Sequence, residues 1–293
     1  MKRTLSPKEL AEALGVSESS LKRWADKGRV RVSKTVGGHR RIPMSEAIRF
    51  AREAGYTVVK PEVFGLPPVA QDVVEHDPEN DGEHLLALLK AGEGDHAKAL
   101  IMNRYFSGET LPSLFDGPLR SAMHEIGKIW HHDPAGIYLE HRATDITLQI
   151  VNQLRSLVGQ DDTPDRPIAI GGGPSGDAYL LPSMMCAALA AETGFREINL
   201  GPNTPTDTLN QAIAEYRPDL VWLTCTVADA CPHPAELEQV LDAAQDVDAI
   251  VALGGQGMAH GLIEPRADVH HLSSMADFHS LCLKTMDANA LAD

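Results

Sequence analysis

Two groups of residues have the types and the spacing to bind a flat or metal-containing ligand. In the first group, Trp130 is followed directly by His131, and Glu140-His141 come after nine intervening residues. An indole plane can cover a macrocycle or a nucleoside, and His or Glu can hydrogen-bond a ribose or ligate a metal. Trp130 could instead be helix core with the histidines on the surface, but the joint spacing favours a ligand-binding cap.

The second group follows short apolar runs near the C-terminus. Asp177-Ala178-Tyr179 follows the run Ile168–Gly171, and similar turns occur at Leu200–Pro205, Thr224-Cys225-Thr226 and Gly254-Gly255. If these runs are parallel strands, the turns lie at their carboxyl ends, where ligands of doubly wound sheets bind. The glycines alone are weak indicators, because such turns also serve packing.

Residues 165–293 predict the sheet that would position this second group. Strand-like runs alternate with helices, which predicts a doubly wound, flavodoxin-like parallel sheet. The predicted strands are Ile168–Gly171, Glu197–Leu200, Leu220–Leu223 and Ala249–Leu253, and the predicted helices are Leu181–Thr193, Asp207–Tyr216 and Pro234–Ala244.

Residues 82–160 have a different pattern, which predicts the helices that carry Trp130. Amphipathic periodicity is broken at Gly92/Gly94, Gly108 and Pro134, so we expect a four-helix bundle. The proline-rich residues 56–81 are predicted to be a linker.

Positive charge is concentrated in the first fifth of the chain. Residues 1–55 carry 13 Lys and Arg against 6 Asp and Glu, a net charge of +7, whereas the whole chain carries −15 and the remainder therefore −22. This asymmetry is typical of a small nucleic-acid reader attached to an acidic module.

The basic segment has the order helix, helix, hairpin, helix, which predicts a winged helix-turn-helix over residues 1–55. Serines before the helices and glycines after them set the boundaries. The predicted elements are helices 7–14 and 18–27, strands 29–32 and 39–43, and a third helix capped by Ser45.

Seven residues of this segment are candidates for contact with DNA. The start of the second helix should face base edges in the major groove, and the hairpin should reach phosphates or the minor groove. A basic face can be merely solvated, but the order of elements favours binding. The candidates are Ser19, Ser20, Lys22, Arg23, His39, Arg40 and Arg41.

Residues 4–54 resemble the MerR-type winged helix, and the wing phrase from Thr35 to Ile42, TVGGHRRI, carries the resemblance. It implies base recognition by the helix that starts at Ser17 and phosphate contacts from the wing. Many MerR proteins dimerise through a long helix directly after this domain, whereas here a proline-rich segment follows. Assembly into a dimer or tetramer is therefore expected to depend on the C-terminal part.

From about residue 82 onward, the chain resembles the cobalamin-binding module of CarH-type light-responsive regulators. In that family the W-x9-EH pattern, here Trp130 with Glu140-His141, belongs to a helical cap over adenosylcobalamin. The residue after the Trp can be a His that binds cobalt once light has removed the adenosyl group. His131 occupies that place.

The lower motif of the family, [DE]-x-H-x-x-G, is only partly present. There the His ligates cobalt from below, and the Gly lets the nucleotide tail of the cofactor descend beside the sheet. This chain has Asp177, but Tyr179 replaces the His and Pro182 replaces the Gly. Tyrosine ligates iron in haem proteins but is a poor substitute for imidazole on cobalt, and proline adds bulk at the mouth of the tail site.

Three hypotheses for the C-terminal module follow. Cobalamin binds with Tyr179 below and His131 or the adenosyl group above; or haem, a bilin or another flat ligand binds through His131, His132 or His141; or the module binds no cofactor and serves oligomerisation or a partner. In each case we expect a cytoplasmic transcription regulator, a repressor, that binds double-stranded operator DNA.

The sequence does not favour an enzyme or a membrane protein. It has no Gly-x-Ser-x-Gly, P-loop or HExxH motif, and Gly171–Gly176 lacks the Lys-Ser/Thr of a Walker loop. No run approaches the roughly 20 apolar residues that span a bilayer. The four scattered cysteines form no CxxC pair, which favours a reduced compartment.

Overall fold

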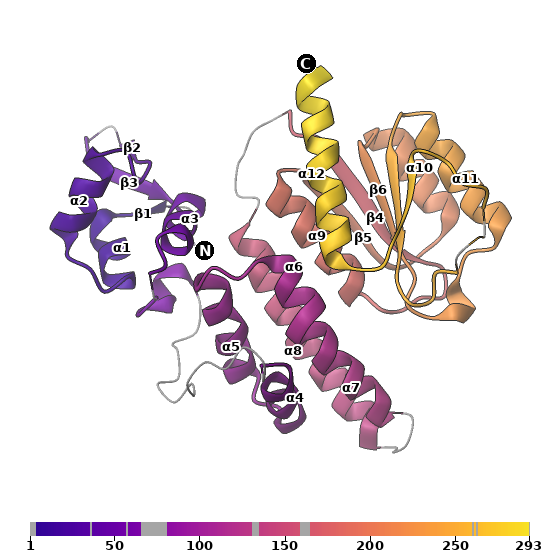
Figure 1. The fold of residues 1–293 in the computed structure, drawn as a ribbon, viewed down its shortest axis with the longest axis horizontal. Coiled ribbons are helices and arrows are strands. Elements are labelled where there is room, and N and C mark those ends of the chain that lie inside the picture. The colour runs from indigo at the N-terminus through magenta and orange to yellow at the C-terminus, as the bar shows by residue number, and fades with distance from the viewer. Residues whose placement is uncertain are drawn as a thin grey trace. The chain divides into compact units, whose positions relative to one another are not determined.

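The computed structural model describes residues 4–35, 37–56, 58–65, 81–130, 135–158, 165–259, 261 and 263–292. They belong to two compact units, residues 1–150 and 151–293. Figure 1 shows the winged helix in indigo, the helical bundle in magenta, and the α/β domain in orange and yellow. No helix among the described residues is long and apolar enough to cross a membrane.

The N-terminal domain is a winged helix, as predicted. Its three short strands pair antiparallel in the order β1-β3-β2. The predicted serine caps are both present: Ser6 Oγ accepts from the N–H of Glu9 at 3.2 Å, and Ser17 Oγ accepts from that of Ser20 at 3.1 Å. The elements are β1 (Thr4–Leu5), α1 (Pro7–Ala13), α2 (Glu18–Asp26), β2 (Ser33–Lys34), β3 (Arg40–Pro43) and α3 (Met44–Glu53).

The predicted strand over residues 29–32 is wrong, because this segment packs on α3 and the strand lies at Ser33–Lys34 instead. The N–H of Arg31 donates to Glu46 Oε1 at 2.7 Å, and Arg49 Nη2 lies 2.5 Å from the same oxygen. Glu46 is only 4% exposed. Burial alone would raise its pKa, but the hydrogen bonds from Arg49 and Arg31 outweigh burial, and the pKa lies below its ordinary value.

The predicted cap of the third helix is also wrong. Helix α3 begins at Met44, Pro43 occupies the N-cap position, and no side chain caps the helix. Ser45 therefore lies inside the first turn. The strand β3 runs directly into α3, so no residue with a free polar side chain separates the two elements.

The first unit continues as a helical bundle, and the predicted breaks are present. Gly92 and Gly108 follow helices with φ of +78° and +103°, a region that favours glycine; Pro134 lies outside the described residues. A π-helical turn, η2, joins α6 to α7, so four helical segments result. They are α4 (Asp81–Ala91), α5 (Gly94–Phe106), α6 (Leu111–Leu114) with η2 (Phe115–Leu119) and α7 (Arg120–Trp130), and α8 (Ala135–Leu157).

The winged helix packs on this bundle through residues that the sequence placed in a linker. A short 3-10 helix, η1 (Pro61–Phe64), buries Phe64, whose ring centroid lies 5.2 Å from that of Phe106. Arg52 of α3 donates to the backbone oxygen of Glu109 at 2.9 Å, and its guanidinium lies 3.9 Å from the centroid of Tyr105. The described part of residues 56–81 is therefore part of a packed interface.

The second unit contains a five-stranded parallel sheet in the order β5-β4-β6-β7-β8, the predicted flavodoxin-like arrangement. Helices α9 and α12 pack together on one face and α10 and α11 on the other (Figure 1). The elements are β4 (Ile168–Pro174), α9 (Leu181–Thr193), β5 (Arg196–Thr204), α10 (Thr206–Tyr216), β6 (Leu220–Thr224), η3 (Ala228–Ala230), α11 (Pro234–Gln245), β7 (Ile250–Gly254), β8 (Val269–Leu272) and α12 (Met275–Ala292).

A buried arginine holds the start of the bundle together. The Arg104 side chain is only 10% exposed, and it lies 2.5 Å from the carboxylate of Asp81 through Nη1 and 2.5 Å from that of Glu109 through Nε. Replacing Arg104 by Ala would leave two carboxylates without their cation in a largely water-excluded place.

We expect Arg104→Ala to lower the free energy of unfolding of the first unit by about 3 kcal/mol, since breaking a buried pair leaves an uncompensated charge. Chemical unfolding followed by helix circular dichroism measures this loss. Lys128→Ala is the control, because its pair with Glu125 is exposed and should contribute little to stability. Equal effects of the two substitutions would contradict the role of Arg104.

Candidate nucleic-acid interface and ligand site

Helix α2 presents the four predicted recognition residues on its outer side. Ser19, Lys22 and Arg23 are exposed, whereas Leu21 between them is fully buried. The hydroxyls of Ser19 and Ser20 each lie 2.9 Å from that of Ser17, so they belong to the cap of the helix. Contact of these residues with base edges stays a prediction.

The wing is attached to α2 by an ion pair that the sequence did not indicate. Arg40 Nη2 lies 2.6 Å from Asp26 Oδ1, and Arg40 Nη1 donates to the backbone oxygen of Lys22 at 3.4 Å. Because this pair joins β3 to the C-terminal end of α2, Arg40 positions the wing against the recognition helix.

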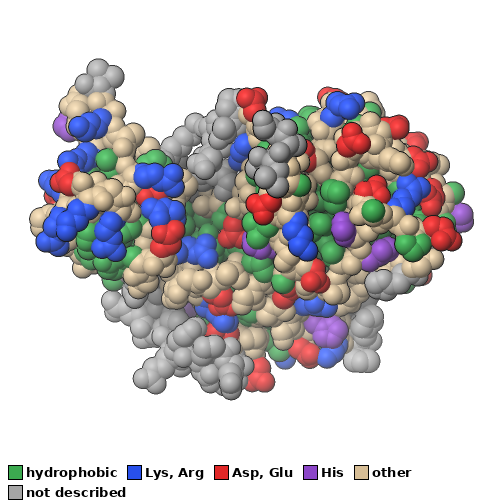
Figure 2. Space-filling model, turned by 45° about the horizontal axis from the view of Figure 1, so that its top comes forward, with side chains coloured by type: hydrophobic (Ala, Val, Ile, Leu, Met, Phe, Trp, Pro, Cys, Tyr) green, Lys and Arg blue, Asp and Glu red, His purple; other side chains and the backbone are tan. Residues whose placement is uncertain are grey.

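The other two candidate residues of the wing differ in exposure. His39 is exposed and Arg41 is half-buried, and Val36 of the wing phrase lies outside the described residues. Within the described part of the chain, neither Arg41 nor Arg23 forms an ion pair, so both guanidinium groups are available for phosphate. Figure 2 shows the Lys and Arg side chains gathered on this domain.

The predicted cap residues can be located only in part. Trp130 is the last residue of α7, and its side chain, together with His131 and His132, lies outside the described part of the chain. Glu140 and His141 lie in the second turn of α8. Glu140 is partly buried and accepts from Thr144 Oγ1 at 2.9 Å, whereas His141 is 76% exposed with its Nε2 3.7 Å from Glu140 Oε2. Their convergence with Trp130 stays a prediction.

Asp177 organises the carboxyl end of the sheet. It is fully buried, and its carboxylate accepts from the backbone N–H groups of Tyr179, at 3.0 Å, and of Thr226. Its own backbone oxygen accepts from the N–H of Asn203 at 2.7 Å. The predicted residues Asp177, Tyr179 and Thr226 are thus brought together, at the ends of β4 and β6, with Asn203 from β5.

The remaining predicted residues at this edge serve mainly the packing of the backbone. Thr224 is buried, and its Oγ1 donates to the backbone oxygen of Gly172 at 3.5 Å. Gly255 has φ of +103°, and a Cβ there would lie 2.1 Å from the backbone oxygen of Cys225. The Gly254 oxygen accepts from the N–H of Cys225 at 2.8 Å. The glycine pair therefore allows two loops to approach closely.

The residues at this edge do not fit a corrin held through a protein imidazole. The ligand position is occupied by Tyr179, which is 39% exposed. A metal-ligating His normally donates its second N–H to a carboxylate, a backbone carbonyl or a water; here the residue is a tyrosine, and Asp177 binds two backbone N–H groups. Among the described residues, no three His, Cys, Asp or Glu side chains lie close enough to hold a metal.

One buried polar atom at this edge remains unsatisfied. Thr226 Oγ1 has no hydrogen-bond partner among the described residues. Because buried hydroxyls in folded proteins normally have a partner, this hydroxyl could accept or donate a bond to a ligand or a water. Among the described residues at the carboxyl end of the sheet, this hydroxyl is the feature that favours a bound molecule.

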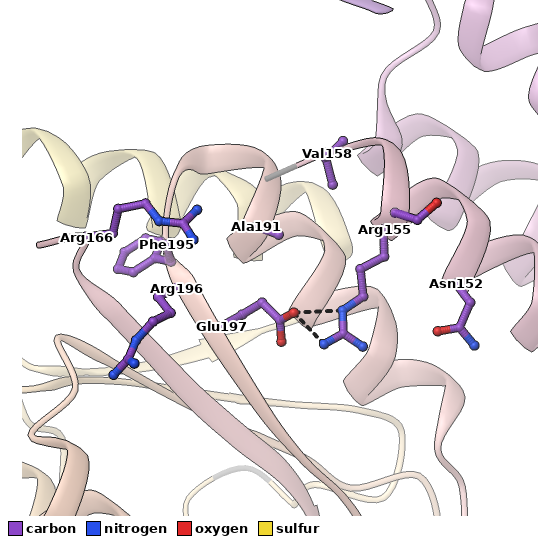
Figure 3. Close-up of a pocket in the computed structure, with 9 residues that line it drawn as sticks. Asn152, Arg155, Val158, Arg166, Ala191, Phe195, Arg196 and Glu197 are labelled. Carbon is purple, nitrogen blue, oxygen red and sulfur yellow. Dashed lines mark hydrogen bonds and ion pairs between the residues drawn. The ribbon is translucent and has the colours of Figure 1, made fainter. Parts of the chain in front are cut away.

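A hollow of about 400 Å³ lies elsewhere, at the amino ends of β4 and β5 (Figure 3). Arg155 Nε donates to Glu197 Oε1 at 2.8 Å, and burial raises the pKa of Glu197 although Arg155 opposes the shift. With Arg166 and Arg196 the lining is positive, which suits an anion. It lies at the opposite ends of the strands from Asp177, so it is not the predicted ligand site.

Two family comparisons define the class of the protein. Residues 4–54 match the helix-turn-helix domain family, and residues 167–270 match the B12 binding domain family. The chain is therefore a DNA-binding regulator with a B12-binding domain, and the resemblance to MerR-type regulators with a CarH-like module is confirmed.

One relative is similar to the chain over most of its length. The chain is 25% identical over 262 residues to the HTH-type transcriptional repressor CarA of Myxococcus xanthus, and the match covers 87% of each chain. The fold is also similar to that of the monomethylamine corrinoid protein of Methanosarcina barkeri, with a TM-score of 0.56 and 13% identity over 72% of this chain and 100% of that one. The latter likeness concerns the fold alone.

We expect Arg40→Ala with Arg41→Ala to weaken binding to every DNA sequence, because phosphate contacts carry no base information. The slope of log affinity against log salt should become shallower by roughly one, for the phosphate that Arg41 no longer neutralises, because Arg40 is already paired with Asp26. Gel-shift titrations over a salt series measure this slope. Lys128→Ala, on α7, removes a positive charge outside the winged helix and is the control. An unchanged slope in the double variant would exclude the wing from DNA binding.

We expect a single thiol, that of Cys231, to react in the folded protein. Burial raises the pKa of Cys225 and of Cys282 to about 12 and raises that of Cys186 as well, so their reactive thiolates are scarce at pH 8. Ellman's reagent should titrate one group in native protein and four in guanidinium. Cys231→Ser should abolish the native reaction; rapid reaction of a second thiol would contradict the buried placement.

Proposed function

We propose that this chain is a transcription repressor that binds double-stranded operator DNA through α2 and the wing. The observation that carries the proposal is the Arg40–Asp26 ion pair, at 2.6 Å, because it joins the two DNA-facing elements into one surface. That surface presents Lys22, Arg23, His39 and Arg41 to the solvent side. Repression, as opposed to activation, is supported by the similarity to a protein named a transcriptional repressor.

We further propose that the C-terminal module controls assembly into a dimer or tetramer. Joining several weakly binding winged-helix domains raises the effective concentration of each domain at its half-site. Assembly therefore raises the affinity for DNA without any new DNA contact. A signal that changes assembly is thereby coupled to operator binding.

Two versions of the module differ in their cofactor. In the first, adenosylcobalamin binds beneath Trp130, His131, Glu140 and His141; the B12-binding match and the unsatisfied Thr226 hydroxyl support it. In the second, the module acts in assembly or partner binding without a cofactor. We favour the second, because Tyr179 replaces the lower imidazole and Pro182 replaces the glycine of the motif.

Light scattering after size exclusion, together with gel shifts on operator DNA, tests the proposal. The protein is compared in the dark and after illumination, with and without adenosylcobalamin. We expect one oligomeric mass and one DNA affinity under all conditions. A mass or affinity that changes with cobalamin or light would select the first version, an absorption spectrum of haem or bilin in the purified protein would contradict the second, and failure to bind any DNA would overturn the repressor itself.

A further inference from the structure

A tryptophan fills the layer between the sheet and helix α9. Trp222 of β6 is 1% exposed and pairs in register with Gly171 of β4. A Cβ at Gly171 would lie 2.5 Å from the indole carbons Cγ and Cδ2, so the indole lies directly against the backbone of β4. Only a glycine at residue 171 permits this contact.

The polar edge of the indole is satisfied inside the protein. Trp222 Nε1 donates to Ser183 Oγ of α9 at 2.9 Å, and the Ser183 hydroxyl donates to Asn199 Oδ1 of β5 at 2.8 Å. The Asn199 oxygen also accepts from the N–H of Gly201 at 2.9 Å. Displacing the indole would break the buried bond between its Nε1–H and the Ser183 hydroxyl, which is costly unless a new partner is found.

The indole is also in contact with α12 and lies under the buried face of α9. Phe278 of α12 meets it edge-on, with ring centroids 6.4 Å apart, and the residues of α9 from Ser183 to Ala191 are all buried. The indole, 1% exposed, therefore contacts β4, α9 and α12.

We infer that Trp222 closes the slot in which the nucleotide tail of cobalamin lies in domains of this kind. In the resembling family the residue at position 182 is a glycine that lets the tail descend beside the sheet. Here Pro182 is in the first turn of α9, and the indole of Trp222 lies beneath the same helix. Both the mouth and the interior of the slot are occupied by the protein itself.

The filled slot affects only the nucleotide tail of cobalamin. The layer between α9 and the sheet is complete without a cofactor, so the domain does not gain stability from an inserted nucleotide. Within this domain the corrin ring could be contacted at the strand ends, without the tail. This inference concerns the α/β domain alone and does not depend on whether the chain represses transcription.

Cobinamide, which has the corrin ring without the nucleotide, provides the test. Hydroxocobalamin and diaquocobinamide are titrated into the full-length protein in the dark, and free ligand is measured by equilibrium dialysis. We expect affinities that agree within threefold, or no binding of either compound. Cobalamin binding more than tenfold tighter than cobinamide in the wild-type protein would overturn the inference.

Two variants isolate the contribution of the indole. In Pro182→Gly with Trp222→Gly, the opened slot should favour cobalamin over cobinamide by tenfold or more. Pro182→Gly alone is the matched control and should keep the wild-type ratio, because the indole still fills the interior. A folded double variant with an unchanged ratio would show that Trp222 is not the barrier. If the double variant does not fold, the wild-type ratio still decides the inference.

Discussion

The buried carboxylate of Asp177 is the interaction on which the functional edge of the α/β domain depends. It binds the backbone of the loops after β4 and β6, and the same residue's carbonyl oxygen binds the end of β5. A fully buried charge is stable only when hydrogen bonds replace its lost hydration. In this domain backbone N–H groups supply those bonds. The carboxylate of Asp177 therefore holds the loops at the strand ends in place.

Asp177 and Trp222 have complementary roles in the same domain. Asp177 fixes the loops above the strand ends, and Trp222 fills the layer below α9. The chain's own residues hold both places, so the fold of this domain does not require the lower histidine. The open hydroxyl of Thr226 is the exception at this edge.

Local interactions made much of the fold predictable from the sequence. The Ser6 and Ser17 caps involve residues three positions apart, and the alternation of apolar runs with helices predicted the flavodoxin-like sheet. The strand β8, with the sequence VHHL, has no apolar run and was not predicted. The strand predicted over residues 29–32 was wrong because Arg31 binds Glu46, which lies 15 residues further along the chain.

The candidate sites could be predicted only at the level of residue type. Tyr179 and Pro182 indicated that the lower cobalamin motif is altered. The role of Trp222, however, depends on Ser183, 39 residues away, and on Phe278. Such contacts form only after three elements have packed. The same holds for Arg40, whose role in positioning the wing depends on Asp26, 14 residues away.

The contacts of Arg52 and Phe64 with α5 have a geometrical consequence for the operator. Because the recognition helix belongs to a domain packed on the bundle, its direction follows the bundle. In a symmetric assembly, the distance between two such helices would then be a property of the oligomer. Half-sites would have to recur at a fixed number of base pairs, on the same side of the double helix, and inserting half a helical turn between them would place one head on the wrong face.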